Sequence, residues 1–285
     1  MALQRNKKGE RHMNPIRVLS IAGSDCSGGA GIQADLKTMC QLGCYGMSVI
    51  CALTAQNTQG VRSVLSVPEW FIRDQIDAVM TDIGADSVKV GMLDRPGVVE
   101  TVSERLRYYR AKRIVVDPVM VSESGCRLLA PEAVDALRQQ LFPLADVITP
   151  NRYESAVLLG IEPTEMFDAE PSRLKDVCVG LAKTGAKAVL LKGGHATDPY
   201  HATDILYIPA EDRFEYVESP RIVTRNTHGT GCTLSSALAA FLGMGFPLIQ
   251  AVAKAKRFVY QAIEGAVSLR LGKGKGPLMH CGIRT

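Results

Sequence analysis

Short apolar stretches rich in valine and isoleucine alternate along the chain with segments of helical period. The short stretches lack a regular polar alternation, which is typical of strands that are buried on both faces of a parallel sheet. We expect seven such strands, at Val18–Ala22, Ser48–Leu53, Val61–Val67, Val88–Met92, Ile114–Val116, Asp146–Thr149 and Ala188–Leu191.

The segments between these strands repeat apolar residues every three or four positions, so they predict helices that cross from strand to strand. Several begin with proline or a polar capping residue, as helix starts commonly do. The predicted helices are Gly31–Leu42, Glu69–Thr81, Gly97–Tyr109, Pro131–Leu141, Arg152–Leu159, Pro171–Lys183, Thr230–Leu242 and Leu248–Leu271. This alternation indicates an α/β fold with a mostly parallel sheet.

A predicted hairpin interrupts this alternation. Ile205–Ile208 and Arg213–Val217 flank a short polar stretch, which favours an antiparallel edge on the sheet. We find no linker or repeat after Pro15, so we expect a single domain over residues 15–285 and a flexible tail over residues 1–14. The glycine- and lysine-rich stretch 272–277 is either a solvated tail or a segment that lies against a nucleotide.

Composition and charge mainly exclude classes of protein. The chain has 285 residues, 46% of them hydrophobic, and a net charge of +4 without a basic stripe, which argues against a nucleic-acid partner. No stretch approaches the ~18 apolar residues of a membrane span, and no apolar signal-peptide core is present. We therefore expect a cytoplasmic protein with no membrane partner. Its 8 cysteines lack zinc-ligand spacing, so free thiols are expected.

The run 225–234 joins small, flexible residues directly to an apolar helix. The first N–H groups of a helix lack intrahelical partners and lie at the positive end of its dipole, so the glycines here predict a phosphate-binding cradle. Cys232 falls in the first helical turn, where the positive end favours the thiolate and makes it a candidate base or nucleophile. The alternative is a glycine-rich cap followed by a buried cysteine.

Three further polar groups follow predicted strands, and loops at the carboxyl ends of parallel strands commonly build ligand sites. Asn151 and Glu154 could hold magnesium through water, or form a helix N-cap with its N3 glutamate. Lys192 could neutralise a phosphate. Asp117 adds a carboxylate to the same edge, unless it is only a turn residue.

The loop after the first strand resembles two familiar motifs and matches neither. The spacing from Gly23 to Gly28 is that of a P-loop, but residue 29 is glycine where that motif needs lysine. The stretch 29–34 is similar to a dinucleotide fingerprint, but the second strand ends without the carboxylate that would bind a ribose.

Taken together, these segments resemble the ribokinase-like family, and within it the hydroxymethylpyrimidine/phosphomethylpyrimidine kinases of thiamine biosynthesis. The resemblance covers nearly the whole chain, and the order of its motifs is more specific than any one of them. The segments that carry it are Ala22–Asp25, Ser27–Thr38, Ala55–Thr58, Lys89–Leu93, Asp117–Met120, Thr149–Asn151, Lys192–His195 and Asn226–Cys232.

This resemblance implies a three-layer α/β/α sandwich, whose mostly parallel central sheet has an antiparallel edge hairpin. It also implies a homodimeric kinase that uses ATP and Mg²⁺. The small-molecule substrate would be 4-amino-5-hydroxymethyl-2-methylpyrimidine, which is phosphorylated first to the monophosphate and then to the diphosphate. Most of the larger family has an aspartate base after Gly-Thr-Gly, and Cys232 at that position matches the pyrimidine kinases.

By the same resemblance, each candidate residue has an expected role. Catalysis would use Cys232 and an anion hole formed by Gly229, Thr230 and Gly231. The pyrimidine pocket would be lined by Gly23, Asp35, Gln56 and Met92. The nucleotide would be contacted by Lys192, Asp117, Asn151, Thr224 and Asn226, and the magnesium ion by Asn151 and Glu154. Arg225 stands where many relatives have lysine, which changes the geometry of any nucleotide contact there.

Two alternatives stay open at this stage. One is a pyridoxal or pyridoxine kinase, and the other is a protein of the same fold that senses the pyrimidine without turnover. Gln56 argues against the first, because its carboxamide can pair with the amino group and adjacent ring nitrogen of the pyrimidine, an edge that pyridoxal lacks. Retention of Asn151, Glu154, Lys192 and Cys232 argues against the second.

Overall fold

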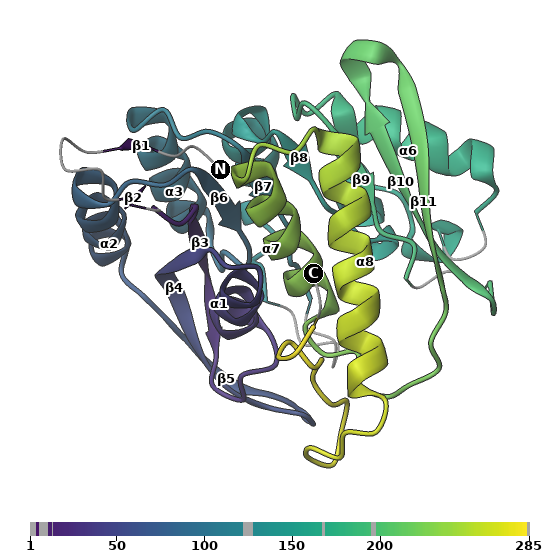
Figure 1. Ribbon diagram of the computed structural model, residues 1–285. Helices are drawn as coiled ribbons and strands as arrows, with labels where there is room; N and C mark the ends of the chain where they lie inside the picture. The colour runs from purple at the N-terminus through teal and green to yellow at the C-terminus, as the bar shows by residue number, and fades with distance from the viewer. Residues whose placement is uncertain are drawn as a thin grey trace.

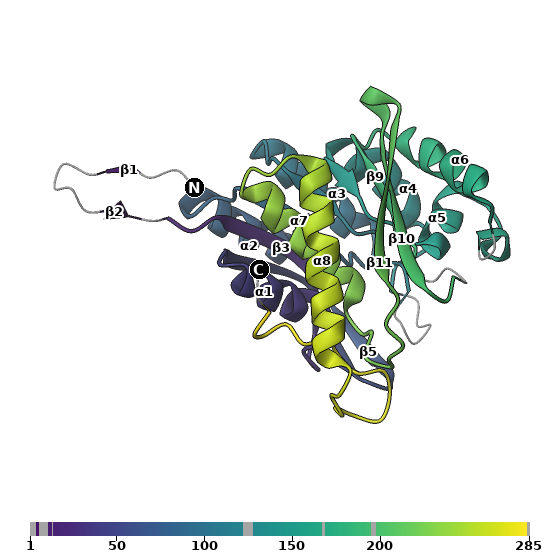
Figure 2. The ribbon, with the colours of Figure 1, turned by 45° about the vertical axis from the view of Figure 1, so that its right-hand side comes forward.

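The computed structural model describes residues 4–5, 11–12, 14–121, 128–166, 169–194 and 198–283. Most of the predicted flexible tail, as well as Cys126 and His195, therefore lies outside the described residues. Within the tail, β1 (Gln4–Arg5) and β2 (Arg11–His12) pair with each other in a separate two-stranded sheet (Figure 2).

The centre of the molecule is a nine-stranded sheet in the order β11-β10-β9-β8-β7-β6-β3-β4-β5 (Figure 1). The strands from β9 to β4 in that order run parallel, and hairpin β10–β11 adds an antiparallel edge, as the sequence predicted. The strands are β3 (Arg17–Asp25), β4 (Tyr45–Asn57), β5 (Gly60–Ser66), β6 (Ser87–Val90), β7 (Ile114–Val116), β8 (Val147–Ile148), β9 (Val189–Leu191), β10 (His201–Ile208) and β11 (Arg213–Pro220).

The prediction that Val61–Val67 is a strand buried on both faces is wrong. Strand β5 is an antiparallel edge strand whose last five residues are exposed, and Leu65 has 66% of its surface accessible. Only residues 58–59 separate β4 from β5. A connection this short permits a hairpin but not the crossover that a parallel strand requires.

Helices cover both faces of the sheet and give the predicted three layers (Figures 1 and 2). One face carries α1 (Gly31–Gln41), α7 (Thr230–Gly243) and α8 (Leu248–Ala266). The other carries α2 (Glu69–Asp82), α3 (Pro96–Tyr108), α4 (Ala133–Ala136), α5 (Arg152–Leu159) and α6 (Pro171–Ala182). Each face of the sheet forms a hydrophobic core with its helices, and successive strand residues point into opposite cores. Leu19 packs on the side of α2 and α3, whereas Val18 packs on the side of α7 and α8.

Two predicted helices differ from the observed ones. The helix expected at Pro131–Leu141 is a short α-helix that continues as a π-turn over Leu137–Leu141 and a 3-10 turn over Phe142–Leu144. Pro143 explains the change, because proline has no N–H and disfavours a helical residue before it. Helix α8 ends at Ala266 rather than Leu271, where the Asn226 side chain donates a hydrogen bond to the Ala266 carbonyl.

Two findings concern the class of protein. Within the described ranges, no helix is both long and apolar enough to span a bilayer. The described cysteines are all free thiols, in agreement with the expectation from the sequence.

A buried ion pair joins α8 to the sheet. Lys256 Nζ lies 2.8 Å from Asp204 Oδ2, and both side chains are at least nine-tenths buried. The other oxygen of Asp204 accepts a hydrogen bond from the backbone N–H of Gly193 at 2.8 Å. Gly193 has no room for a side chain, since a Cβ there would lie 1.7 Å from the Thr203 carbonyl oxygen. The pair therefore fixes the backbone that follows β9.

We expect Lys256→Met to lower the free energy of unfolding by about 3–5 kcal/mol, because it leaves the buried Asp204 carboxylate without its counter-charge. Urea titration followed by circular dichroism measures this loss. The double variant Lys256→Met/Asp204→Asn should recover part of it, since no buried charge is then unpaired. An unchanged midpoint for Lys256→Met would mean that the Gly193 hydrogen bond alone satisfies Asp204.

Candidate active site

The start of α7 forms a cradle of backbone N–H groups. Gly229 has a left-handed backbone with φ of +86°, and a Cβ there would lie 1.9 Å from the Gly29 carbonyl oxygen, so glycine is required. Among the described residues, no hydrogen bond uses the backbone N–H of Gly231 or Cys232. The helix start thus has the geometry of an anion site, and its binding of phosphate stays a prediction.

Lys192 and Asp117 lie beside this cradle. Lys192 Nζ is 2.6 Å from Asp117 Oδ1, and a Cβ at Gly231 would lie 3.4 Å from the same nitrogen. Burial opposes ionisation of Asp117, but the ammonium groups of Lys192 and Lys89 lower its pKa. The ends of β7 and β9 thus bring a cation and its counter-charge to the start of α7.

Asn151 and Glu154 form the capping box that was one of the two predicted alternatives. Asn151 Oδ1 accepts a hydrogen bond from the Glu154 N–H at 2.8 Å, and Glu154 Oε2 accepts one from the Asn151 N–H at 2.7 Å. Glu154 Oε2 also lies 3.6 Å from Lys192 Nζ. Burial raises the pKa of Glu154 to about 7. The N-cap is confirmed, and it brings this carboxylate next to Lys192.

Magnesium would have to find most of its ligands elsewhere. The described part of the chain contains no group of three or more His, Cys, Asp or Glu side chains arranged as a metal site. Glu154 Oε1 takes part in no described hydrogen bond, so one carboxylate oxygen is available. Magnesium bound with nucleotides commonly uses one or two carboxylates together with phosphates and water, and the residues present fit that pattern.

Of the residues predicted to line the acceptor pocket, Gly23 and Met92 lie together. A Cβ at Gly23 would be 2.9 Å from Met92 Sδ, so glycine leaves room for the methionine. The Gln56 carboxamide accepts a hydrogen bond from Thr54 Oγ1 at 3.1 Å and lies 3.3 Å from His228 Nε2. Gln56 is thereby linked to the loop that precedes the cradle.

Asp25 and His228 were not assigned a role from the sequence. His228 Nε2 lies 2.8 Å from Asp25 Oδ2, and that carboxylate also accepts hydrogen bonds from Ser27 and Ala30. These hydrogen bonds lower the pKa of Asp25 in spite of its burial. The position of His228 beside Gly-Thr-Gly was a signal for a role at the site, but its partner could be found only in the structure.

Asp35 does not face the surface of the predicted pocket. Its side chain is completely buried, and its oxygens accept hydrogen bonds from Ser20 Oγ, Ser236 Oγ and Lys89 Nζ at 2.6, 2.6 and 2.7 Å. The structure places this carboxylate beneath the start of α7. Its direct contact with an acceptor stays a prediction.

The expectation that the helix start lowers the pKa of Cys232 is wrong. Burial raises this pKa to about 11, and the carboxylates of Asp35 and Asp117 raise it further. Lys89 and a backbone hydrogen bond act in the opposite direction but do not outweigh burial. Burial therefore disfavours the Cys232 thiolate, and the groups that act to stabilise it are Lys89 and the backbone N–H of Gly31.

Thr224 and Asn226 support the backbone next to the cradle. Asn226 is completely buried, and its amide nitrogen donates to the carbonyl oxygens of Ala266 and Leu269 at 2.6 and 3.1 Å. Thr224 Oγ1 accepts a hydrogen bond from the Asn226 N–H at 3.1 Å. The expected contact of these two residues with a nucleotide stays a prediction.

The C-terminal segment 272–283, here called the strap, packs along the site. Gly274 N–H donates to Thr58 Oγ1 at 3.2 Å, and Gly276 accepts a hydrogen bond from the His228 N–H at 3.0 Å. His280 is buried, and its Nε2 lies 2.9 Å from Thr233 Oγ1. Within the stretch 272–277, residues 272, 273 and 275 are exposed, as expected for a solvated segment, whereas Gly276 is buried against the protein itself.

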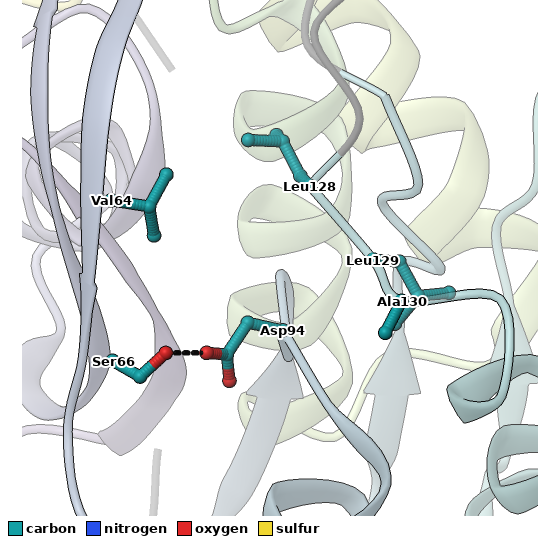
Figure 3. A pocket seen from close by; sticks show the side chains of 6 residues that line it. All are labelled: Val64, Ser66, Asp94, Leu128, Leu129 and Ala130. Carbon is teal, nitrogen blue, oxygen red and sulfur yellow. Dashed lines mark hydrogen bonds between the residues drawn. The ribbon is translucent and has the colours of Figure 1, made fainter.

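A cavity of about 350 Å³ opens between β5 and the loop after β6 (Figure 3). Asp94, two residues after Met92, lies in its wall, and Ser66 Oγ donates a hydrogen bond to Asp94 Oδ2 (Figure 3). Sequence reasoning did not find this cavity, because its walls come from segments far apart in the chain. It is lined by Val64, Ser66, Asp94, Leu128, Leu129 and Ala130.

Comparison with known proteins assigns the family. A family model described as phosphomethylpyrimidine kinase matches residues 25–279. The chain belongs to the phosphomethylpyrimidine kinase family. The matched region of this family member includes the loop after β3, the ends of the parallel strands and the cradle at α7.

Individual relatives agree with this family assignment. A hydroxymethylpyrimidine/phosphomethylpyrimidine kinase of Rhizobium meliloti is 48% identical over 262 residues, which are 92% of this chain and 96% of that protein. The solved structure of a phosphomethylpyrimidine kinase from Clostridium difficile matches with a TM-score of 0.75 and 43% sequence identity. The match covers 87% of this chain and 99% of the Clostridium difficile chain. The structure of an ADP complex of Bacillus subtilis pyridoxal kinase matches with a TM-score of 0.84 and 36% sequence identity. The match covers 93% of this chain and 97% of the pyridoxal kinase chain.

His280 predicts how stability depends on pH. Burial lowers its pKa from 6.5 to about 4, so the unfolded chain binds a proton between these values while the folded protein does not. The contribution of His280 to the free energy of unfolding is therefore highest above pH 6.5 and decreases as the pH falls. We expect a loss of about 2 kcal/mol between about pH 7 and pH 5, measured by urea titration.

The variant His280→Gln is the control for this effect, because it can still donate to Thr233 Oγ1 but does not titrate. Its stability should depend less on pH than that of the wild type by the same amount. If the free energy of unfolding depended on pH in the same way in both proteins, His280 would not be the group responsible.

Proposed function

We propose that this protein transfers the γ-phosphate of ATP to 4-amino-5-hydroxymethyl-2-methylpyrimidine, and then phosphorylates the monophosphate to the diphosphate, in thiamine biosynthesis. Residues 15–285 would form one kinase domain. The observation that carries the proposal is the α7 cradle with Lys192 and Asp117 beside it, in a chain of this family. Relatives with the same pair of activities in their names support the choice of substrate.

Phosphoryl transfer requires mainly positioning and stabilisation of charge. The free N–H groups of Gly231 and Cys232 would bind phosphate oxygens, and the α7 dipole favours negative charge at this point. Lys192, fixed by Asp117 and Glu154, would add a positive charge to the same oxygens. When bound, magnesium supplies further charge neutralisation, and Glu154 and Asn151 are the residues that would hold it, directly or through water.

The acceptor would lie between the loop after β3 and Gln56. Gly23 has no side chain, which lets Met92 Sδ pack against the backbone here, and the methionine would contact one face of the ring. Gln56 would pair with the aminopyrimidine edge, and the hydroxyl of Thr54 would fix the orientation of its carboxamide. This pairing favours the pyrimidine over pyridoxal. Pyridoxal remains the comparison substrate of choice, since structural neighbours include pyridoxal kinases.

The two phosphorylations make different demands on the protein. In the first, the hydroxyl must lose a proton as its oxygen bonds to phosphorus, and Cys232 is the group that we propose takes or orients this proton. In the second, the acceptor is a phosphate that is already ionised. The cradle therefore matters for both steps, and Cys232 mainly for the first.

We expect Cys232→Ala to reduce the first phosphorylation by about 10²–10⁴-fold, the usual contribution of a general base, and the second by less. Nucleotide affinity should hardly change, because the cradle consists of backbone groups. Purified protein with Mg-ATP is given each acceptor separately, and products are identified by mass. Cys40→Ala, at an exposed thiol in α1, is the matched control.

Two outcomes would contradict the proposal. Near wild-type rates for Cys232→Ala on the free alcohol would show that Cys232 is a packing residue. Tight binding of the pyrimidine by the wild type without either product would favour the sensor alternative.

We also propose that a second copy of the chain packs against the edge hairpin β4–β5 and the start of α2. Leu53 and Leu65 are paired across the hairpin and therefore face the same side. Trp70 and Phe71 are exposed at the start of α2, so the edge strand and this helix expose several large apolar side chains. Exposed apolar edge strands favour association. The homodimer would cover this patch.

Leu65→Asp should shift the protein from dimer to monomer, because it introduces a charge into this apolar patch. Sedimentation velocity at micromolar concentration measures the state. Tyr200→Asp, at an exposed residue next to β10 on the opposite edge of the sheet, is the control and should leave it unchanged. A wild-type monomer, or a dimer that survives Leu65→Asp, would remove this surface from consideration.

A further inference from the structure

A buried ammonium group lies below the active site and has no role in the mechanism so far. Lys89 Nζ is 2.7 Å from Asp35 Oδ2, and neither side chain has any exposed surface. A buried ion pair is costly to desolvate and adds little stability compared with an apolar pair of similar size. The position of this pair therefore suggests a function other than stability.

The pair is held directly beneath Cys232. Asp35 Oδ1 accepts a hydrogen bond from Ser236 Oγ at 2.6 Å. Ser236 is four residues after Cys232 on α7, so the two side chains point from the same face of the helix. The Asp35 carboxylate, and with it the Lys89 ammonium, thus lies one helical turn below the thiol.

The backbone around Lys89 leaves space for its ammonium group. A Cβ at Gly91 would lie 2.6 Å from Lys89 Nζ, and the methyl group of Ala22 lies 3.0 Å from the same Cβ position. Two small residues, Ala22 of β3 and Gly91 after β6, border this space. The charge is therefore fixed in one place, between Asp35 and the start of α7.

Charged groups face Cys232 from four elements. Lys89 of β6 lowers the pKa of the thiol, while Asp35 of α1 and Asp117, directly after β7, raise it. The fourth group is Lys192 at the end of β9, which is paired with Asp117 and Glu154. Lys89 is therefore the cation with the larger effect on the thiol, Lys192 acts in the same direction, and Asp35 partly offsets Lys89.

We propose that Lys89 is a positioning residue whose ammonium group, fixed by Asp35, stabilises the Cys232 thiolate that accepts the proton of the alcohol. This inference rests on the proposed function. In the step concerned, the hydroxyl proton passes to Cys232 Sγ and the oxygen forms a bond to the γ-phosphorus. The bond from that phosphorus to its β,γ-bridging oxygen breaks, and the electron pair leaves on ADP. The thiol later returns the proton to water.

The test compares two variants that leave no buried carboxylate unpaired. Asp35→Asn removes the offsetting charge and keeps Lys89. Lys89→Met/Asp35→Asn removes both charges, so the difference between the two variants isolates Lys89. The double variant Lys256→Met/Asp204→Asn removes a second buried Lys–Asp pair, whose charges do not act on Cys232, and serves as the matched control.

The readout is the ionisation of Cys232 itself. Alkylation by iodoacetamide is followed at several pH values by mass spectrometry of the Cys232 peptide, and needs neither ATP nor acceptor. At about pH 8, Asp35→Asn should react about tenfold faster than the wild type, because a decrease of one pKa unit changes the thiolate fraction by that factor. The double variant should return to the wild-type rate or below, and the control variant should match the wild type.

Equal alkylation rates for Asp35→Asn and Lys89→Met/Asp35→Asn would overturn the proposal. A second measurement is the pH profile of kcat for the alcohol, whose acidic limb should lie at higher pH in Lys89→Met/Asp35→Asn than in Asp35→Asn, with a smaller difference for the monophosphate. The two proposals fail separately. A wild type that forms no phosphorylated pyrimidine, but shows the expected thiol titration, refutes the proposed function and leaves the effect of Lys89 on Cys232 established.

Discussion

The active site depends on one cluster of buried charges at the start of α7. Two ammonium groups, Lys89 and Lys192, alternate there with the carboxylates of Asp35, Asp117 and Glu154, and none of these side chains is more than 13% exposed. A single unpaired charge in this place would cost several kcal/mol. The ends of β6, β7 and β9 and the starts of α1, α5 and α7 must therefore meet at one point, because each supplies a partner to another.

Close approach of the backbone makes this meeting possible. Gly229 lies against Gly29 and Gly91 lies against the Lys89 ammonium group, and in neither place is there room for a Cβ. The same loops carry the groups that would bind phosphate and acceptor. His228 joins them, since its Nε2 lies 2.8 Å from Asp25 Oδ2 and 3.3 Å from the Gln56 amide nitrogen. A change in the loop after β3 would therefore alter the cradle, even though the two segments are about 200 residues apart in sequence.

Features with a local physical cause could be predicted from the sequence, and those with a distant cause could not. The capping box of α5 is visible as Asn151 and Glu154, and the start of α7 as a glycine turn before an apolar run, because both depend on neighbouring residues. The pKa of Cys232 depends on carboxylates contributed by α1 and β7. The exposure of β5 depends on which strand it pairs with, and the course of the strap on hydrogen bonds to Thr58 and Thr233. A pattern of residues along the chain contains none of these distances.

The charge cluster also explains how one site could serve an alcohol and a phosphate. With Glu154 protonated, two ammonium groups balance two carboxylates, and the cluster is neutral. The positive end of the α7 dipole then dominates the potential at the cradle, which favours an anionic acceptor. Burial raises the pKa of Glu154 to about 7, so this carboxyl group can gain or lose a proton at little cost near neutral pH. A cation that binds Glu154 would displace that proton, and the resulting negative charge would be neutralised by the cation itself. The charge of the cluster would thus change together with its ligands, while the Lys89–Asp35 pair beneath Cys232 would stay fixed.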